Sequence, residues 1–257
     1  MRTMLSMTTS TPSALITGGT SGIGRATAKL LHERGYRVAL TGQGASSTAR
    51  ARAELPDDVL VLRSDSRSLD DTARMIDEVR DRFGQLTTLF VNAGVSRATP
   101  LGSVDEQTWD DVLGINTKGA FFTVQSALPL LVDGAAIVFT VGIGATPPYG
   151  IAGGSVAAAS RGALLAMVPT LALELAARRI RVNAVSPGAI DTPIWSKFGM
   201  STEAADAQKQ ALASRIPLGR LGDASEIAET VAFLASDGAT YLTGQNIVVA
   251  GGSGLAM

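Results

Sequence analysis

The stretch Thr17-Gly-Gly-Thr-Ser-Gly-Ile-Gly24 decides the fold class of this chain. It follows an apolar run of strand length and opens a helical run. Its glycines at positions 18, 22 and 24 allow a tight turn, a close approach of backbone to a ligand, and close packing of helix on strand. The first turn of such a helix offers free N–H groups and a positive dipole end to phosphate. A tight turn without a ligand is the alternative, and the flanking strand and helix favour the phosphate loop.

Outward from this loop, apolar runs of strand length alternate with helical periods. Most runs are continuously apolar, as in parallel strands that are covered on both faces. Short connections imply right-handed crossovers. The sequence therefore predicts an α/β fold of the Rossmann type, a doubly wound parallel sheet of about seven strands with helices on both faces. The expected strands span residues 14–17, 37–41, 59–62, 88–91, 137–141, 181–185 and 246–250.

Three polar tetrapeptides predict helix starts. Ser68-Leu-Asp-Asp71 and Asp223-Ala-Ser-Glu226 are typical N-terminal caps, and Ser103-Val-Asp-Glu106 matches a capping box. Pro169 falls inside an expected helix over residues 163–177 and predicts a local kink there.

The domain organisation is simple. We expect a flexible tail over residues 1–12 and one dinucleotide-binding domain over residues 13–257. Residues 191–222 interrupt the strand–helix rhythm, and a long excursion beyond a strand end is a usual place for a substrate lid. Its Trp195, Phe198 and Met200, beside Lys197, suggest an apolar pocket, although they serve equally well as packing residues.

Composition excludes several classes of protein. The net charge is -1, with 22 Lys+Arg against 23 Asp+Glu, so binding to nucleic acid lacks its electrostatic driving force. The chain has no Cys and one His, which argues against disulfides, zinc-thiolate sites and any His-rich metal centre. The uncharged segment 134–160 contains Pro147-Pro148 and six glycines, so we expect a buried strand and a loop rather than a membrane span. A soluble cytoplasmic protein is the expectation.

Further motifs follow the glycine loop in order. They are Asn92-Ala-Gly94, Asn116, Arg181-Val-Asn-Ala-Val-Ser-Pro-Gly188 with Ile190 and Thr192, Tyr241-Leu-Thr-Gly-Gln245, and Gly251-Gly252. Together with the Thr-Gly-x-x-x-Gly-x-Gly spacing, they resemble the short-chain dehydrogenase/reductase family from about residue 12 to the end. The resemblance implies a nicotinamide dinucleotide, a small-molecule carbonyl or alcohol substrate, and a homo-oligomer, either dimer or tetramer.

The resemblance also implies the residues that hold the cofactor, with Asp65 at the adenine. They are Gly18, Thr20, Ser21, Gly22, Ile23, Gly24, Gln43, Asp65, Ser66, Asn92, Ala93, Gly94, Arg161, Pro187, Gly188, Ile190 and Thr192.

The second strand bears on the choice of dinucleotide. It ends Ala39-Leu-Thr-Gly-Gln43, and an acidic residue here would bind the ribose 2′-hydroxyl and select NAD. Because none is present, we slightly favour NADP(H) over NAD(H). Arg50 and Arg52 are candidates to reach a 2′-phosphate, but a solvated helix face is the favoured interpretation.

The catalytic set departs from the family. In the family a Ser polarises the carbonyl, a Tyr exchanges the proton, and a Lys four residues later binds the nicotinamide ribose and lowers the Tyr pKa. Here alignment puts Gly142, Ala157 and Arg161 at these places, and Asn116 alone is retained as the family's active-site Asn. Ala157 has no proton to donate, and losing a general acid costs about 10²–10⁴ in rate. Arg161 can hold the ribose but is not equivalent to Lys.

Other hydroxyls lie near in sequence. Tyr149, in Pro147-Pro-Tyr-Gly150, could be a relocated acid, and Ser155 is a second hydroxyl. We favour a packing role for Tyr149.

Three functional readings follow from these departures. The first is an NAD(P)-dependent oxidoreductase with a non-standard proton-transfer set in which Asn116, Arg161 and Tyr149 are the candidates. The second is a catalytically silent dinucleotide-binding sensor, or the partner subunit of an active homologue. Lyase or isomerase chemistry without net redox change stays open as a third.

Overall fold

The computed structural model describes residues 11–97, 99–193 and 201–255. The expected tail over residues 1–12 therefore lies almost wholly outside the described residues. So do four side chains of the expected lid: Trp195, Lys197, Phe198 and Met200.

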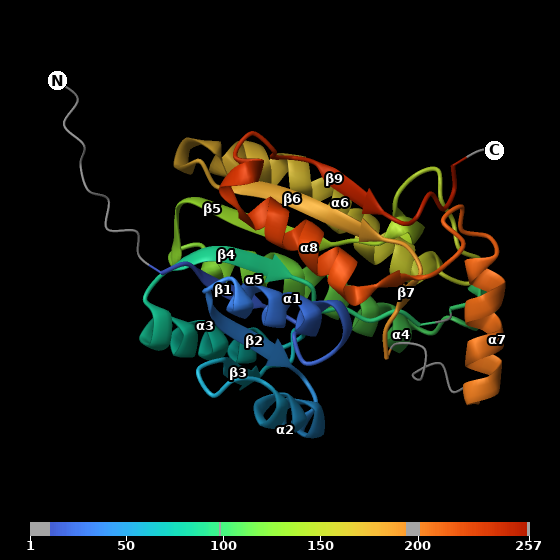
Figure 1. The fold of residues 1–257 in the computed structure, drawn as a ribbon, viewed down its shortest axis with the longest axis horizontal. Coiled ribbons are helices and arrows are strands. Elements are labelled where there is room, and N and C mark those ends of the chain that lie inside the picture. The colour runs from blue at the N-terminus through green and yellow to red at the C-terminus, as the bar shows by residue number, and fades with distance from the viewer. Residues whose placement is uncertain (1–10, 98, 194–200, 256–257) are drawn as a thin grey trace.

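A seven-stranded sheet forms the centre of the molecule (Figure 1). All its strands are parallel, which confirms the doubly wound α/β fold. In spatial order they are β3 (Leu60–Arg63), β2 (Arg37–Gly42), β1 (Ser13–Ile16), β4 (Leu86–Val91), β5 (Leu131–Thr140), β6 (Arg181–Pro187) and β9 (Asn246–Val249). Each of the seven expected strands is present, although β5 begins several residues earlier than expected.

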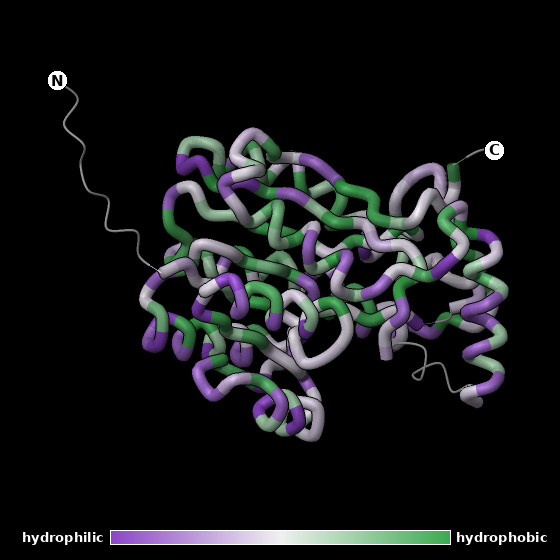
Figure 2. Tube along the Cα trace, in the orientation of Figure 1, coloured by the Kyte–Doolittle hydropathy of each residue, from purple (hydrophilic) through white to green (hydrophobic). Residues whose placement is uncertain are grey.

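Helices cover both faces of the sheet (Figure 1). One face carries α1 (Gly22–Glu33), α2 (Ala45–Glu54) and α8 (Ala224–Ala235), and the other carries α3 (Leu69–Phe83), α4 (Glu106–Leu113), α5 (Ala120–Ala127) and α6 (Ser155–Leu175). Successive strand side chains point to opposite faces, so Leu15 joins the α3–α5–α6 core and Ile16 the α1–α8 core. In Figure 2, purple hydrophilic residues alternate with pale green hydrophobic ones along α7 (Thr202–Ala213).

Helix caps are local features, and two of the three predictions are confirmed. Ser68 accepts a hydrogen bond from Asp71 N, and Asp223 forms a complete capping box with Glu226. The prediction for Ser103 is wrong: α4 begins at Glu106, and Asp105 caps it by accepting from Thr108 N. The Ser103 hydroxyl instead donates to the Pro100 carbonyl in a 3₁₀ turn, which leaves the cap to the neighbouring carboxylate.

Helix α6 runs from Ser155 to Leu175 with Pro169 inside it. Together with the turn after it, this helix is the one segment of the described residues that is long and apolar enough to cross a membrane by length and composition. Buried helices of globular proteins pass the same test, and Leu164, Val168 and Ala172 pack into the core here. Residues 134–160 form the end of β5, a loop and the start of α6, as expected of a strand followed by a loop.

A second, two-stranded sheet lies at the base of the expected lid. It pairs β7 (Ile190–Asp191) with β8 (Gly222–Asp223), and α7 lies between them in the chain. Each strand is only two residues long, so the sequence holds no hydrophobic pattern that could predict it.

Candidate active site

A large cleft opens where the strand order reverses between β1 and β4. In doubly wound sheets, ligands bind beyond the carboxyl ends of the strands at this place. The cleft has a volume of about 730 Å³. Thirteen of the predicted residues line it: Gly18, Thr20, Ser21, Gly22, Ile23, Gln43, Asp65, Ser66, Asn92, Ala93, Gly94, Arg161 and Thr192.

The glycine loop has the form of a phosphate cradle. Gly18 has φ +66°, and a Cβ there would lie 2.8 Å from the Ala93 Cα, so a side chain has no room. Gly22, the first residue of α1, has φ +52°. The N-cap residue Ser21 gives α1 no side-chain hydrogen bond, and the first turn holds no acidic residue. The first-turn N–H groups are therefore available to an anion, and the loop fits a pyrophosphate.

Asn92 fixes the loop against the neighbouring strands. Its Nδ2 donates to the carbonyls of Thr17 (3.2 Å) and Gly18 (3.1 Å), and its Oδ1 accepts from the Thr140 hydroxyl at 3.0 Å. One side chain thus ties together the ends of β1, β4 and β5. Gly24 does not line the cleft; it lies against the Gly18 carbonyl, where a Cβ would not fit, and lets α1 pack closely on the loop.

Over β2 and β3 the cleft is polar. Asp65 accepts from Gln43 Nε2 at 2.9 Å and from Arg67 Nη2 at 2.8 Å. The hydrogen bonds from Arg67 hold the pKa of the Asp65 carboxyl below its usual value. Gln43, at the end of β2, is neutral, so no carboxylate occupies the position that would select NAD.

Two residues that were not among the predicted cofactor-binding residues lie at the same end; Ser47 was missed, and Arg50 was assigned to a solvated helix face. Ser47 and Arg50, both from α2, line the cleft, and Arg50 makes no hydrogen bond or ion pair with any described residue. Arg52 points elsewhere: its Nε and Nη2 donate to the Val61 carbonyl. The spacing of basic residues on α2 was visible in the sequence, but their facing directions required the packed helix.

Arg161 occupies the other half of the cleft, over β4 and β5. Its Nη1 donates to the Thr140 carbonyl at 2.5 Å, and its Nη2 lies where a side chain at Gly94 would have to stand. Burial lowers the pKa of Arg161 to about 10, so the guanidinium stays charged at neutral pH. An arginine so placed has several donors left for ribose hydroxyls.

Asn116 is fully buried and does not line the cleft. It lies in a π-helical segment, Gly114–Gly119, between α4 and α5. Its Nδ2 donates to the Val95 carbonyl and to the Ser160 hydroxyl, both at 2.9 Å, and its Oδ1 accepts from Val95 N at 2.8 Å. The side chain therefore positions the loop after β4 against α6.

Two of the residues that the sequence alignment predicts at the family's catalytic positions, Gly142 and Ala157, have no side chain that could donate a proton. Gly142 follows β5 by two residues and has φ +98°, and Ala157 stands in the first turn of α6. Tyr149 does not line the cleft among the described residues; its ring lies against Gly254 near the C-terminus. Ser155 is exposed at the start of α6. A role for Tyr149 as a relocated acid stays a prediction.

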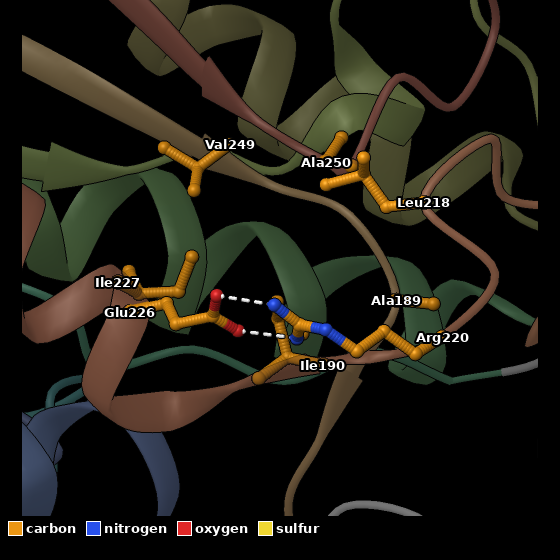
Figure 3. A pocket seen from close by; sticks show the side chains of 10 residues that line it. Ala189, Ile190, Leu218, Arg220, Glu226, Ile227, Val249 and Ala250 are labelled. Carbon is orange, nitrogen blue, oxygen red and sulfur yellow. Dashed lines mark hydrogen bonds and ion pairs between the residues drawn. The ribbon is translucent and has the colours of Figure 1, made fainter.

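Residues of the segment after β6 line two different cavities. Thr192 reaches the large cleft and lies against Gly22, whereas Ile190 lines a separate cavity of about 120 Å³ (Figure 3). Pro187 and Gly188 line neither; Gly188 packs on Ala250 at the end of β9.

An ion pair braces the smaller cavity. The Arg220 guanidinium donates to both carboxylate oxygens of Glu226, each at 2.7 Å, as Figure 3 shows. Glu226 also accepts from Asp223 N at 2.8 Å. The pair fixes β8 to the start of α8, and β8 in turn holds β7.

Comparison with known proteins agrees with this geometry. A family model described as enoyl-(acyl carrier protein) reductase matches residues 18–254. A crystal structure from Brucella melitensis, titled a short-chain dehydrogenase/reductase of the glucose/ribitol dehydrogenase type, superimposes with a TM-score of 0.87 at 32% identity, covering 95% of this chain and 97% of that one. The chain belongs to the short-chain dehydrogenase/reductase family.

Curated relatives in this family are oxidoreductases. The 3-oxoacyl-(acyl-carrier-protein) reductase of Staphylococcus aureus is 39% identical over 249 residues, covering 94% of this chain and 98% of the relative. The cis-4-hydroxycyclohexanecarboxylate dehydrogenase of Sinomonas cyclohexanicum is 35% identical over 250 residues, covering 93% and 95%. This chain is therefore an oxidoreductase of the short-chain dehydrogenase/reductase type.

Proposed function

We propose that this protein is an NADP(H)-dependent oxidoreductase that interconverts a carbonyl and an alcohol with a non-standard proton-transfer set. The observation that carries the proposal is the cleft, which is lined by the phosphate loop, by the neutral Gln43 at the end of β2 and by Arg161. We place it in the cytoplasm as a homo-oligomer, in line with the absence of cysteine and with the apolar outer face of α6.

The residues would divide the work along the cleft. The first turn of α1 binds the pyrophosphate, and Asp65 meets the adenine. Arg161 holds the nicotinamide ribose, and Asn116 keeps α6 in place. A bound nicotinamide supplies or accepts the hydride, and the substrate oxygen then needs a proton. Ala157 has none to give, so the proton comes from water or from a hydroxyl that reaches the cleft when substrate is bound.

Turnover is the direct test. Purified protein is mixed with NADPH or NADH and a panel of ketones, keto acids and 3-oxoacyl thioesters, and cofactor oxidation is followed by absorbance. Oxidation of NADPH that depends on one substrate class supports the proposal. Tight NADPH binding with no turnover across the panel would favour the silent sensor or partner subunit. Product formed with no net change in the cofactor would indicate lyase or isomerase chemistry.

The preference for NADP(H) has its own test at Arg50. Its guanidinium is unpaired among the described residues and lines the end of the cleft where the 2′-phosphate belongs. We expect Arg50→Met to weaken NADPH binding about tenfold, because a charge-assisted hydrogen bond is worth about 1.5–3 kcal/mol. NADH, without the 2′-phosphate, should bind the variant and the parent alike in a fluorescence titration. Arg52→Met, whose side chain points to Val61, is the matched control. Equal losses for both dinucleotides would contradict the assignment.

A further inference from the structure

The dinucleotide cleft has two chemically different halves. On one side of the glycine loop, Gln43, Asp65 and Arg50 lie over β2, β3 and α2. On the other side, Gly94, Val95, Ile115, Thr140 and Arg161 lie over β4, β5 and α6; we call this the α6 half. Because the loop holds the pyrophosphate at the centre and the adenosine lies over β2 and β3, the nicotinamide belongs in the α6 half.

Arg161 is the one ionisable side chain among the described residues that line the α6 half. Its hydrogen bond to the Thr140 carbonyl satisfies one of five donors and neutralises none of the charge. No Asp or Glu of the described chain forms an ion pair with it, and the undescribed segments contain no Asp or Glu. The α6 half therefore carries an uncompensated positive charge.

No side chain beside Arg161 in the described part of the cleft can ionise to neutralise its guanidinium charge. A tyrosine at position 157 could lose its phenolic proton and so neutralise the Arg161 guanidinium, but Ala157 cannot ionise. Burial makes the charge costly, as the lowered pKa of Arg161, about 10, also indicates. Charges in such a partly enclosed site act over a longer range than in water, because the effective dielectric constant is lower.

The charge of the nicotinamide ring, which we expect to bind in the α6 half, depends on the oxidation state of the dinucleotide. The nicotinamide ring of NADP⁺ carries a formal positive charge, and the dihydronicotinamide ring of NADPH is neutral. We propose that the uncompensated charge of Arg161 makes this cleft bind the reduced dinucleotide more tightly than the oxidised one. This inference rests on the proposed function and adds to it which oxidation state of the cofactor binds more tightly and which residue causes the difference.

The test compares two dissociation constants in one protein. NADPH and NADP⁺ are titrated separately into the full-length protein by calorimetry. We expect NADPH to bind at least tenfold more tightly than NADP⁺, which converts to about 1.4 kcal/mol. Equal constants in the unmodified protein would overturn the inference without any variant. Failure of both ligands to bind would overturn the proposed function and, with it, the inference.

Variants then assign the preference to the charge. Arg161→Met is expected to reduce the ratio of the two constants to near unity, whereas Arg161→Lys, which keeps the charge, is expected to retain it. Arg50→Met is the matched control: it should weaken both ligands by the same factor, because both carry the 2′-phosphate, and leave the ratio unchanged. A ratio that survives in folded Arg161→Met, as judged by circular dichroism, contradicts the assignment. If Arg161→Met does not fold, loss of the ratio in Arg161→Lys contradicts it instead.

Discussion

At the scale of single residues, the methyl group of Ala157 matters most for chemistry. It stands in the first turn of α6, four residues before Arg161, where the sequence alignment predicts the family's phenol. The sequence alignment also predicts Gly142 at the place of the family's Ser and Arg161 at the place of its Lys. The predicted differences from the family therefore lie in one turn of α6 and at Gly142, two residues after β5.

Restoring the phenol gives the first prediction at this scale. Ala157→Tyr should raise the rate of carbonyl reduction by about 10²-fold, because it supplies a general acid beside a cation that favours the phenolate. The rate is measured with NADPH and the best substrate of the panel, together with its pH profile. Ala158→Tyr, one residue along the same helix, is the matched control and should give no gain. An unchanged rate in folded, NADPH-binding Ala157→Tyr would show that the protein already has a competent acid.

Asn116 allows a prediction about stability. The side chain makes three hydrogen bonds while fully buried, two to the backbone of Val95 and one to Ser160. We expect Asn116→Ala to lower the free energy of unfolding by about 2–4 kcal/mol, because buried groups are left unsatisfied. Urea unfolding measures the change. Gln107→Ala on exposed α4 should change stability by less than about 0.5 kcal/mol, and equal effects of the two substitutions would be evidence against a structural role for Asn116.

At the scale of elements, the start of α8 depends on a charge. The hydrogen bonds from Arg220 and from Asp223 N lower the pKa of Glu226 to about 2, from an ordinary value of 4.5. A depressed carboxyl pKa stabilises the fold above the unfolded-state value, and the contribution is lost as the pH falls from 4.5 toward 2. This ion pair holds β8, and through β8 it holds the strand that leads to Thr192 in the cleft.

The prediction for this element is a pH-dependent difference. Glu226→Gln should unfold at lower urea than the unmodified protein at pH 7, and the two midpoints should converge as the pH is lowered below about 4.5. Glu78→Gln on the exposed face of α3, where no ion pair is formed with a described residue, should show no such convergence. A gap that stays constant down to pH 3 would mean that Glu226 acts through packing rather than charge.

The prediction for the whole molecule concerns assembly. Leu173 on α6 is 81% exposed, and Phe121 on α5 is 37% exposed, although both helices are strongly apolar. Such a surface is typical of a protein–protein interface. We expect a dimer or tetramer in solution, and we expect Leu173→Glu to shift it toward monomer because the substitution buries a charge at the contact.

Light scattering coupled to gel filtration measures the mass. Leu69→Glu at the start of α3, another partly exposed leucine, should leave the assembly unchanged. A monomeric parent protein, or an assembly indifferent to Leu173→Glu, would contradict the role given to α6.

By itself the sequence determined the sheet, its strands and the phosphate loop. These depend on signals that are local in the chain: continuous apolar runs, glycine spacing and short polar caps. The wrong prediction for the N-cap of α4 shows the limit of such local signals. Ser103 and Asp105 are both suitable N-cap residues, and Asp105 takes this place because Ser103 belongs to the 3₁₀ turn after Pro100.

Only the tertiary structure decided which side chains meet. Four residues that the sequence placed at the site do not line the cleft, namely Pro187, Gly188, Ile190 and Tyr149, whereas Arg50 does line it. Among the described residues the tertiary structure also left Arg161 without a carboxylate partner, which depends on β4, β5 and α6 coming together from distant parts of the chain. Charge compensation is a property of three-dimensional neighbours, which is why the sequence could place the arginine but not reveal that it stands alone.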